Sequence, residues 1–179
     1  MAIVHAARAK LIRILQNAYS GELGAGYAYR GHWRSVSDPE ERAHIHQIED
    51  EEWHHRRLVG EMLSDLGGHP NRIREAIFFV IGRTLGILCH VSGWFAPMYG
   101  AGKLERHNIV EYEDAAQFAR ECGRDDLIEC LLTMAEVEWE HELYFRSKVL
   151  TRPRLLRWIK LWSPAPPKET IRARFSRAA

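Results

Sequence analysis

Glu52-Trp53-His54-His55 and Glu138-Trp139-Glu140-His141 are two copies of one pattern, Glu-Trp-x-His, within a chain of 179 residues. Each copy is preceded by a lone glutamate, Glu22 for the first and Glu105 for the second, at gaps of 30 and 33 residues. In both copies a tyrosine stands seven residues after the lone glutamate. The repeat indicates that two parts of the chain are built alike.

The spacing inside each copy is that of a helical metal site. Residues three apart on an α-helix share a face, so Glu and His of one copy can bind the same ion. Four carboxylates and two imidazoles, spread over two helix pairs, are the ligand set of a di-iron or di-manganese carboxylate bundle. Such oxygen and nitrogen donors suit two iron ions, with manganese as the alternative, and the lack of thiolates disfavours structural zinc. The expected ligands are Glu22, Glu52, His55, Glu105, Glu138 and His141.

A second register is open in the first copy, because Glu51 and His54 have the same spacing as Glu52 and His55. A shift of one residue turns the ligand face by about 100°. The match between the copies favours Glu52 with His55.

The third carboxylate also has rivals, since Glu111 and Glu113 lie on the same predicted helix as Glu105. The repeat favours Glu105. The two repeated tyrosines, Tyr29 and Tyr112, are expected either in the core or as hydrogen-bond donors to the ligands.

Helical periodicity runs through the chain, and the alternation typical of strands is absent. The pattern predicts helices at about 2–33, 39–66, 72–95, 98–122 and 124–150. We therefore expect an all-α, ferritin-like four-helix bundle over residues 1–150, followed by a basic tail with Trp and Pro over residues 151–179.

The predicted helix at 72–95 is a long hydrophobic crossover between the second and third bundle helices. About 23 residues at ~1.5 Å each give ~35 Å, enough to span such a bundle. Pro97 and the run Gly100-Ala101-Gly102 are expected to form the turn after it. Its apolar side chains are candidates for a substrate-binding wall, with plain bundle core as the alternative: Phe78, Phe79, Leu85, Leu88, Trp94 and Phe95.

Composition narrows the classes of partner. The net charge of +1 gives no reason to expect nucleic acid. Three cysteines form no Cys-x-x-Cys, and the N-terminal segment lacks the apolar core of a signal peptide, so we expect a cytoplasmic protein. No apolar run is long enough for a transmembrane helix. Cations alternate with Leu, Ile and Trp over residues 152–162. This pattern is typical of a segment that lies on the inner face of an anionic membrane, and the alternative is a protein or dimer contact.

The segment Gly21-Glu22-Leu23-Gly24-Ala25 resembles the Gly-Glu-x-Gly-Ala motif of the demethoxyubiquinone hydroxylases, which are ferritin-like di-iron monooxygenases of ubiquinone synthesis. Glu-x-x-His at 52–55, the crossover with Leu85-Gly86 and Gly93, and Glu138-Trp139-Glu140-His141 are similar to later parts of that family's pattern. The resemblance covers roughly residues 17–148. It implies that Glu52 and Glu138 bridge the metals, that Glu22 and Glu105 are terminal ligands, and that each histidine binds one metal.

The chain departs from the family pattern in three places. Tyr19-Ser20 replaces the family's His-Ala before Gly-Glu, the loop between the third and fourth bundle helices is shorter, and the basic tail replaces an apolar C-terminal helix. None of the three touches the expected metal ligands.

Together these observations predict a di-iron oxidase or monooxygenase that acts with O₂ on a lipophilic, quinone-like substrate, as a homodimer at a membrane surface. The sequence does not name the electron donor. Two alternatives stay open. One is an iron-oxidising or iron-handling protein without an organic substrate, and the other is a non-catalytic helical interaction bundle.

Overall fold

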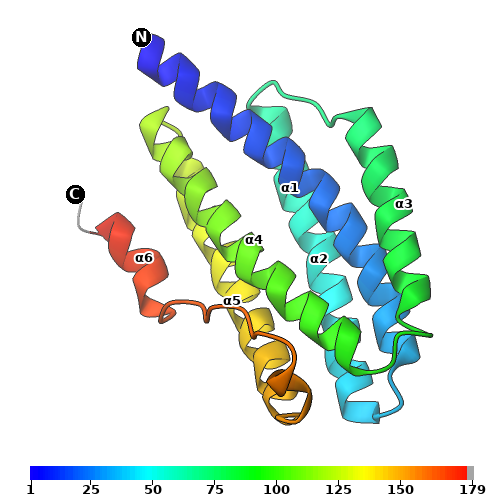
Figure 1. Ribbon diagram of the computed structural model, residues 1–179. Coiled ribbons are helices and arrows are strands. Elements are labelled where there is room, and N and C mark those ends of the chain that lie inside the picture. Colours follow the sequence, from blue (N-terminus) through cyan, green and yellow to red (C-terminus); the bar gives the residue numbers. More distant parts are fainter. Residues whose placement is uncertain (177–179) are drawn as a thin grey trace. The chain divides into compact units, whose positions relative to one another are not determined.

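The computed structural model describes residues 1–176, and within that range every regular element is helical. The chain divides into two compact units, which meet in sequence between Pro97 and Met98. The predicted all-α class is confirmed, and residues 177–179 of the predicted tail lie outside the described residues. The elements are α1 (Ala2–Ser35), α2 (Pro39–Asp65), α3 (Arg72–Leu88), α4 (Phe95–Glu121), η1 (Asp125–Leu127), α5 (Ile128–Leu150), η2 (Leu155–Arg157) and α6 (Glu169–Ser176) (Figure 1).

In unit 1, a short connection joins α1 to α2, and the N-terminus of α2 carries a well-formed cap. The Asp38 carboxylate accepts a hydrogen bond from the Glu41 backbone N–H at 2.9 Å, and Pro39 occupies the first turn, where its missing N–H costs nothing. At the other end Gly67 adopts φ 65°, a conformation that favours glycine, and ends the helix. Both signals were legible in the sequence, and both helix ends lie within two residues of the prediction.

The third helix of unit 1, α3, lies beside α1 (Figure 1). Glycines form the contact between these two helices. A Cβ on Gly31 would collide with the backbone of Gly86, and a Cβ on Gly82 would collide with the backbone of Gly24. Two helices can approach this closely only where neither carries a side chain. Arg56 adds a polar tie, since its guanidinium forms an ion pair with Glu75 of α3.

The core of unit 1 is made mainly of aliphatic side chains on the inner stripes of α1 and α2. Burial of each large one stabilises the fold by about 1.5–3 kcal/mol. The largest fully buried members are Leu11, Leu15, Ile45, Ile48, Leu63 and Leu66.

The crossover helix is shorter than predicted. It ends at Leu88, and a turn over residues 89–94, with Gly93 at φ 75°, precedes the start of α4 at Phe95. Its 17 residues span about 25 Å rather than ~35 Å. The predicted turn at Pro97 was therefore wrong. Proline fits the first turn of a helix as well as a loop, because the first N–H groups of a helix have no partner within it.

In unit 2, α4 and α5 form the helix pair. Gly123 ends the first helix at φ 73°, and the short turn η1 leads into α5, which begins at Ile128 rather than near residue 124. Asp126 forms a two-point contact with Arg124, at 2.7 and 2.9 Å. This local ion pair lies at the 3-10 turn that precedes the α-helix. The large buried residues of this unit include Met98, Ile109, Tyr112, Leu131, Met134 and Phe145.

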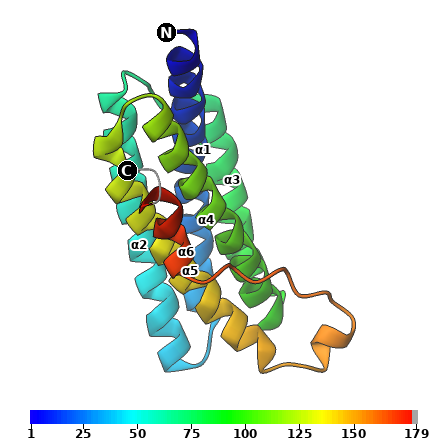
Figure 2. The ribbon, with the colours of Figure 1, turned by 90° about the vertical axis from the view of Figure 1, so that its left-hand side faces the viewer.

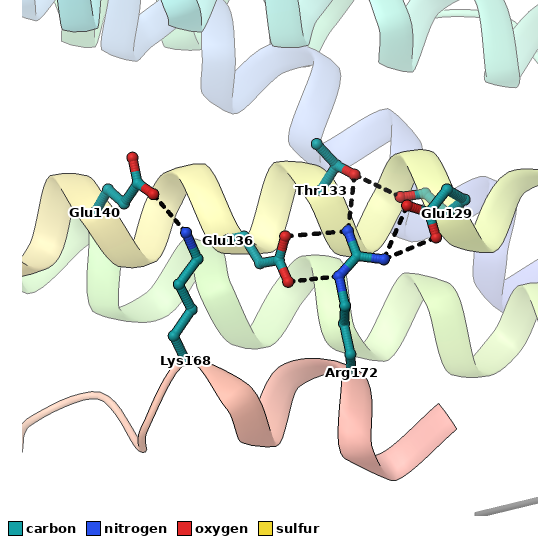
Figure 3. Close-up of polar contacts among 6 residues, drawn as sticks. All are labelled: Glu129, Thr133, Glu136, Glu140, Lys168 and Arg172. Carbon is teal, nitrogen blue, oxygen red and sulfur yellow. Dashed lines mark hydrogen bonds and ion pairs between the residues drawn. The ribbon is translucent and has the colours of Figure 1, made fainter. Parts of the chain in front are cut away.

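The described part of the predicted tail belongs to unit 2. After α5 the chain makes the short turn η2, continues through an extended proline-containing stretch, and returns along α5 as α6 (Figure 2). We call residues 151–176 the C-terminal strap. Figure 3 shows how its last helix is held: Arg172 contacts Glu129, Thr133 and Glu136, and Lys168 contacts Glu140.

Among the strap side chains whose burial the structure describes, two are buried, Trp162 with 9 % of its surface exposed and Ile171 with none. The Trp162 indole N–H donates to Glu142 Oε1 at 2.6 Å. A Cβ on Gly102 of α4 would collide with the Trp162 ring, so this glycine opens the space that the tryptophan fills.

No helix among residues 1–176 is both long enough and apolar enough to cross a bilayer.

Candidate metal centre

Unit 1 brings three of the predicted ligands together. Glu22 on α1 and the pair Glu52 and His55 on α2 each offer a ligand atom, and these atoms lie within 4.8 Å of one another. All three side chains are buried, and Glu52 is completely so. We call these residues the first cluster.

The buried Glu-x-x-His pair of α2 is Glu52 with His55. Glu52 and His55 are buried, whereas Glu51 is only half-buried and His54 is exposed. A step of one residue turns a side chain by about 100°, so the rival pair faces away from the first cluster. This stretch contains two Glu-x-x-His pairs, and only Glu52 with His55 is buried.

Unit 2 builds a second cluster from the equivalent positions. Glu105 of α4, with Glu138 and His141 of α5, also places one ligand atom each within 4.8 Å of the others, and all three are buried. His141 Nδ1 lies 3.6 Å from Glu138 Oε2. The Asn108 amide, one turn along α4, donates to Glu105 Oε2 at 2.8 Å and orients that carboxylate.

Electrostatics in the second cluster favour the binding of a cation. Burial, followed by the neighbouring Glu138 carboxylate, raises the pKa of Glu105 well above its usual range. A raised pKa means that two negative charges are not held side by side without a compensating positive charge, which a proton supplies here. A divalent ion supplies the same compensation, and the carboxylate and imidazole donors of both clusters fit iron or manganese.

The rival acids of α4 do not belong to this cluster. Glu111 is half-buried and Glu113 is buried, but neither joins the group that contains Glu105. The repeat therefore selected the carboxylate that the structure groups with Glu138 and His141.

Both repeated tyrosines are buried, Tyr29 in unit 1 and Tyr112 in unit 2. Tyr29 stacks on His32, with ring centroids 6.2 Å apart and planes 18° apart. His32 is buried too, and this burial lowers its pKa to about 4, so the ring is neutral at pH 7. His32 was not predicted. Its spacing of three from Tyr29 was the available signal.

A buried glutamate that the sequence reasoning missed supports the first cluster. Glu49, one turn before Glu52, accepts hydrogen bonds from Arg30 and Trp33, each at 2.7 Å, and from Trp53 at 3.1 Å. Burial raises the pKa of Glu49, but these bonds outweigh it and leave the pKa below the usual value. The network ties α1 to the ligand helix. The clue was the spacing of three between Glu49 and Glu52, hidden in an acidic run that reads as solvent-exposed.

The second cluster has a different support, which also escaped prediction. Glu142, one residue after His141, is buried and accepts hydrogen bonds from Arg146 at 2.7 Å and Trp162 at 2.6 Å. The C-terminal strap is thus connected directly to the ligand helix of unit 2.

The candidate substrate-wall residues of unit 1 differ in burial and in their contacts. Leu85 and Leu88 are each 47 % exposed. Phe79 packs edge-on against Tyr27 at 5.0 Å, and the Trp94 indole donates to Glu41 at 2.7 Å. The two remaining candidates, Phe78 and Phe95, are half-buried, and Phe78 lies over Gly24, two residues from the ligand Glu22.

Five further histidines lie at exposed positions: His44, His46, His69, His90 and His107.

Comparison with known proteins places this site in a family. The family model described as "Ubiquinone biosynthesis protein COQ7" matches residues 9–144, a span that contains both clusters. The curated proteins contain no match, and neither do the solved structures. The family is that of the demethoxyubiquinone hydroxylases, within the ferritin-like di-iron superfamily, so the predicted resemblance and the ferritin-like class are confirmed. The chain belongs to the COQ7 family of ubiquinone biosynthesis proteins.

Proposed function

We propose that the first and second clusters together hold two iron ions, and that the chain is a di-iron monooxygenase that hydroxylates a lipophilic, quinone-like substrate. One observation carries the proposal. Each unit gathers a buried Glu, Glu and His from equivalent helix positions, so the repeat in sequence is also a repeat in space. Family membership supports the same function, because its description names ubiquinone biosynthesis.

Charge balance supports a pair of ions rather than one. The six ligands include four carboxylates, whose four negative charges two divalent cations neutralise. Each cluster alone offers three ligands. Glu22, Glu52 and His55 of the first cluster, with Glu105, Glu138 and His141 of the second, would hold the two ions.

Bound iron would supply the activation of O₂ and the transfer of one oxygen atom to the substrate. The protein's own residues would position and shield the ions. Asn108 holds the Glu105 carboxylate at 2.8 Å, and the Glu49 network fixes α2 against α1. Glu52, Glu105 and Glu138 are completely buried, so the surrounding protein shields their carboxylates from bulk water.

The substrate class rests on the family and on the apolar character of α3. Among the predicted wall residues, Phe78 packs over Gly24, which is two residues from Glu22 in the sequence. We keep Phe78 as the leading contact for a quinone ring. Leu85 and Leu88, which are exposed, would instead touch an isoprenoid tail or a lipid surface. The homodimer, and the identity of the electron donor, are not needed for this proposal.

The test starts from metal content. Full-length protein is loaded with Fe(II) without oxygen and desalted, and iron is counted per chain. It is then reduced, mixed with a short-chain demethoxyquinone, and exposed to ¹⁸O₂. Two irons per chain and one labelled oxygen in the hydroxylated product are expected.

Controls separate the alternatives. Glu51→Ala and Glu111→Ala should bind two irons as the wild type does, because neither side chain belongs to a cluster. Iron oxidation without a labelled product, in a large multi-subunit assembly on size exclusion, would favour iron handling. Protein that retains no iron would leave only a non-catalytic bundle.

A further inference from the structure

The end of α5 and most of the C-terminal strap form a stretch with a very uneven charge. Between Glu142 and Glu169 there is no acidic residue, whereas Lys and Arg occur seven times. Four of these cations fall within residues 152–160, and all four are exposed: Arg152, Arg154, Arg157 and Lys160. The stretch lies outside the residues that the family model matches.

Exposed apolar side chains alternate with these cations. Trp158 is 88 % exposed, and Leu155 and Ile159 beside it are 43 % and 39 % exposed. Single exposed hydrophobic residues are common on protein surfaces and need no explanation. A cluster of one indole and two aliphatic side chains, surrounded by four cations, indicates an interaction site.

Residues 152–160, which we call the loop, are held in place at both ends. On one side it continues from α5, whose last turn is capped by the Thr151 N–H. On the other side Trp162 is buried, Arg146 donates to the Trp162 carbonyl at 3.1 Å, and the Tyr99 hydroxyl donates to the Lys160 carbonyl at 2.6 Å. Two tryptophans four residues apart therefore have different roles. The buried Trp162 anchors the loop, whereas the exposed Trp158 projects from it.

We propose that residues 152–160 dock unit 2 onto the surface of an anionic lipid bilayer, with Trp158, Leu155 and Ile159 inserted at the headgroup level and the cations on lipid phosphates. Tryptophan prefers this interface because its ring is apolar and its N–H is polar. Lys and Arg next to it are attracted by the negative surface. A second copy of the chain is a poorer partner, because two such loops repel each other. The proposal does not depend on the metal content of the protein.

The test is co-sedimentation of the full chain with vesicles of phosphatidylcholine alone, or with about one third phosphatidylglycerol. Binding is expected on the anionic vesicles and should weaken at about 1 M NaCl, where the Debye length is ~3 Å. Each cation near the surface contributes about a fivefold factor, so Arg154→Gln with Arg157→Gln should weaken binding about thirtyfold. Trp158→Ala should weaken it about tenfold.

The matched control is Arg13→Gln with Arg34→Gln, which removes the same charge from exposed positions of α1. It should bind as the wild type does. A spectroscopic readout is independent of affinity. Anionic vesicles should shift the tryptophan emission of the wild type to shorter wavelength, and the shift should be lost in Trp158→Phe.

Three results would overturn the proposal. The control could weaken binding as much as the loop variants do, which would reduce the effect to net charge. Ile77→Ser with Val80→Ser on exposed α3 could abolish binding while the loop variants keep it, which would make α3 the anchor. Finally, the wild type could ignore anionic vesicles yet bind immobilised polyglutamate, which would make an acidic protein the partner.

Discussion

The two units present the same candidate metal ligands at equivalent helix positions, yet the residues around these ligands differ. Four residues after the ligand Glu52 stands Arg56, which ties α2 to α3 through Glu75. Four residues after the ligand Glu138 stands Glu142, which ties α5 to the C-terminal strap through Trp162. The same helix position therefore binds a further segment in both units, α3 in unit 1 and the strap in unit 2. The side chain at this position is a cation in unit 1 and an anion in unit 2. Metal binding would constrain the candidate ligands, whereas the supporting residue only has to hold the helix in place.

The repeated tryptophans show the same division. The Trp53 indole donates to Glu49 within its own helix, and its ring occupies the space left by Gly26 of α1. The Trp139 indole donates to the carbonyl of Pro166 in the strap at 2.8 Å. Identical residues at identical positions thus stabilise a helix pair in one unit and a C-terminal extension in the other.

The largest expected effect tests whether the two clusters act as one site. If Glu52 and Glu138 bridge a shared pair of ions, Glu52→Ala and Glu138→Ala should each reduce iron from two per chain to near none. Iron counted after anaerobic loading and desalting is the measurement. One iron remaining in either variant would show that the two clusters bind metal independently.

The next effect concerns the strap as the support of unit 2. Trp162→Ala should lower the free energy of unfolding by about 3–5 kcal/mol, because a buried aromatic ring and its bond to Glu142 are lost. Trp158→Ala, at an exposed position of the same loop, should change it by less than about 0.5 kcal/mol. Chemical denaturation of both variants makes the comparison. Equal stabilities would mean that the strap does not support α5.

A pH dependence should come from unit 1, where His32 is buried, and not from the equivalent position of unit 2, which is Ala115. Burial lowers the pKa of His32 from 6.5 to about 4. Between these values the unfolded chain binds more protons than the folded one, so stability falls as the pH falls. The full loss is about 3 kcal/mol, reached near pH 4.

The measurement for His32 is the free energy of unfolding against pH for the wild type and His32→Gln. The variant is expected to be less stable at pH 7, because a packed ring is lost, but to have a shallower slope between pH 6.5 and 4. An unchanged slope would assign the acid sensitivity to other groups.

The smallest expected effect concerns Asn108, which orients Glu105 and has no counterpart in the first cluster, where Ala25 occupies the equivalent position. Asn108→Ala should weaken metal binding about 10–100-fold, as is usual when a partner of a ligand is removed. Ala25→Ser serves as the control on the other side of the repeat. Competition with a chelator of known affinity measures both.

The sequence predicted the fold class and both clusters because these depend on local, periodic information. Helix caps such as Asp38 and Gly67 act on their own neighbours, and Glu-x-x-His has meaning as soon as the segment is helical. Glu49 and Glu142 were missed for the opposite reason. An acidic residue on a charged helix is usually solvated, and only the arrival of Arg30, Trp33 or Trp162 from distant positions makes it a buried acceptor.

The end of the crossover was misjudged because proline is ambiguous there. Pro97 is compatible with a loop and with the first turn of a helix, so the sequence could not separate the two. The turn at residues 89–94 is fixed instead by Gly93 and by the Trp94 indole, which reaches Glu41 on α2. That contact spans more than fifty positions and carries no local signal.

The amino-acid sequence by itself determined which six side chains form the two clusters and which face of each helix carries them, because a period of 3.6 residues aligns chemistry along one stripe. Tertiary structure alone decided what holds those helices: glycine contacts between α1 and α3 in unit 1, and a buried tryptophan beneath a returning strap in unit 2. Such support depends on volume and proximity between distant segments, and neither is written in the spacing of residues along a chain.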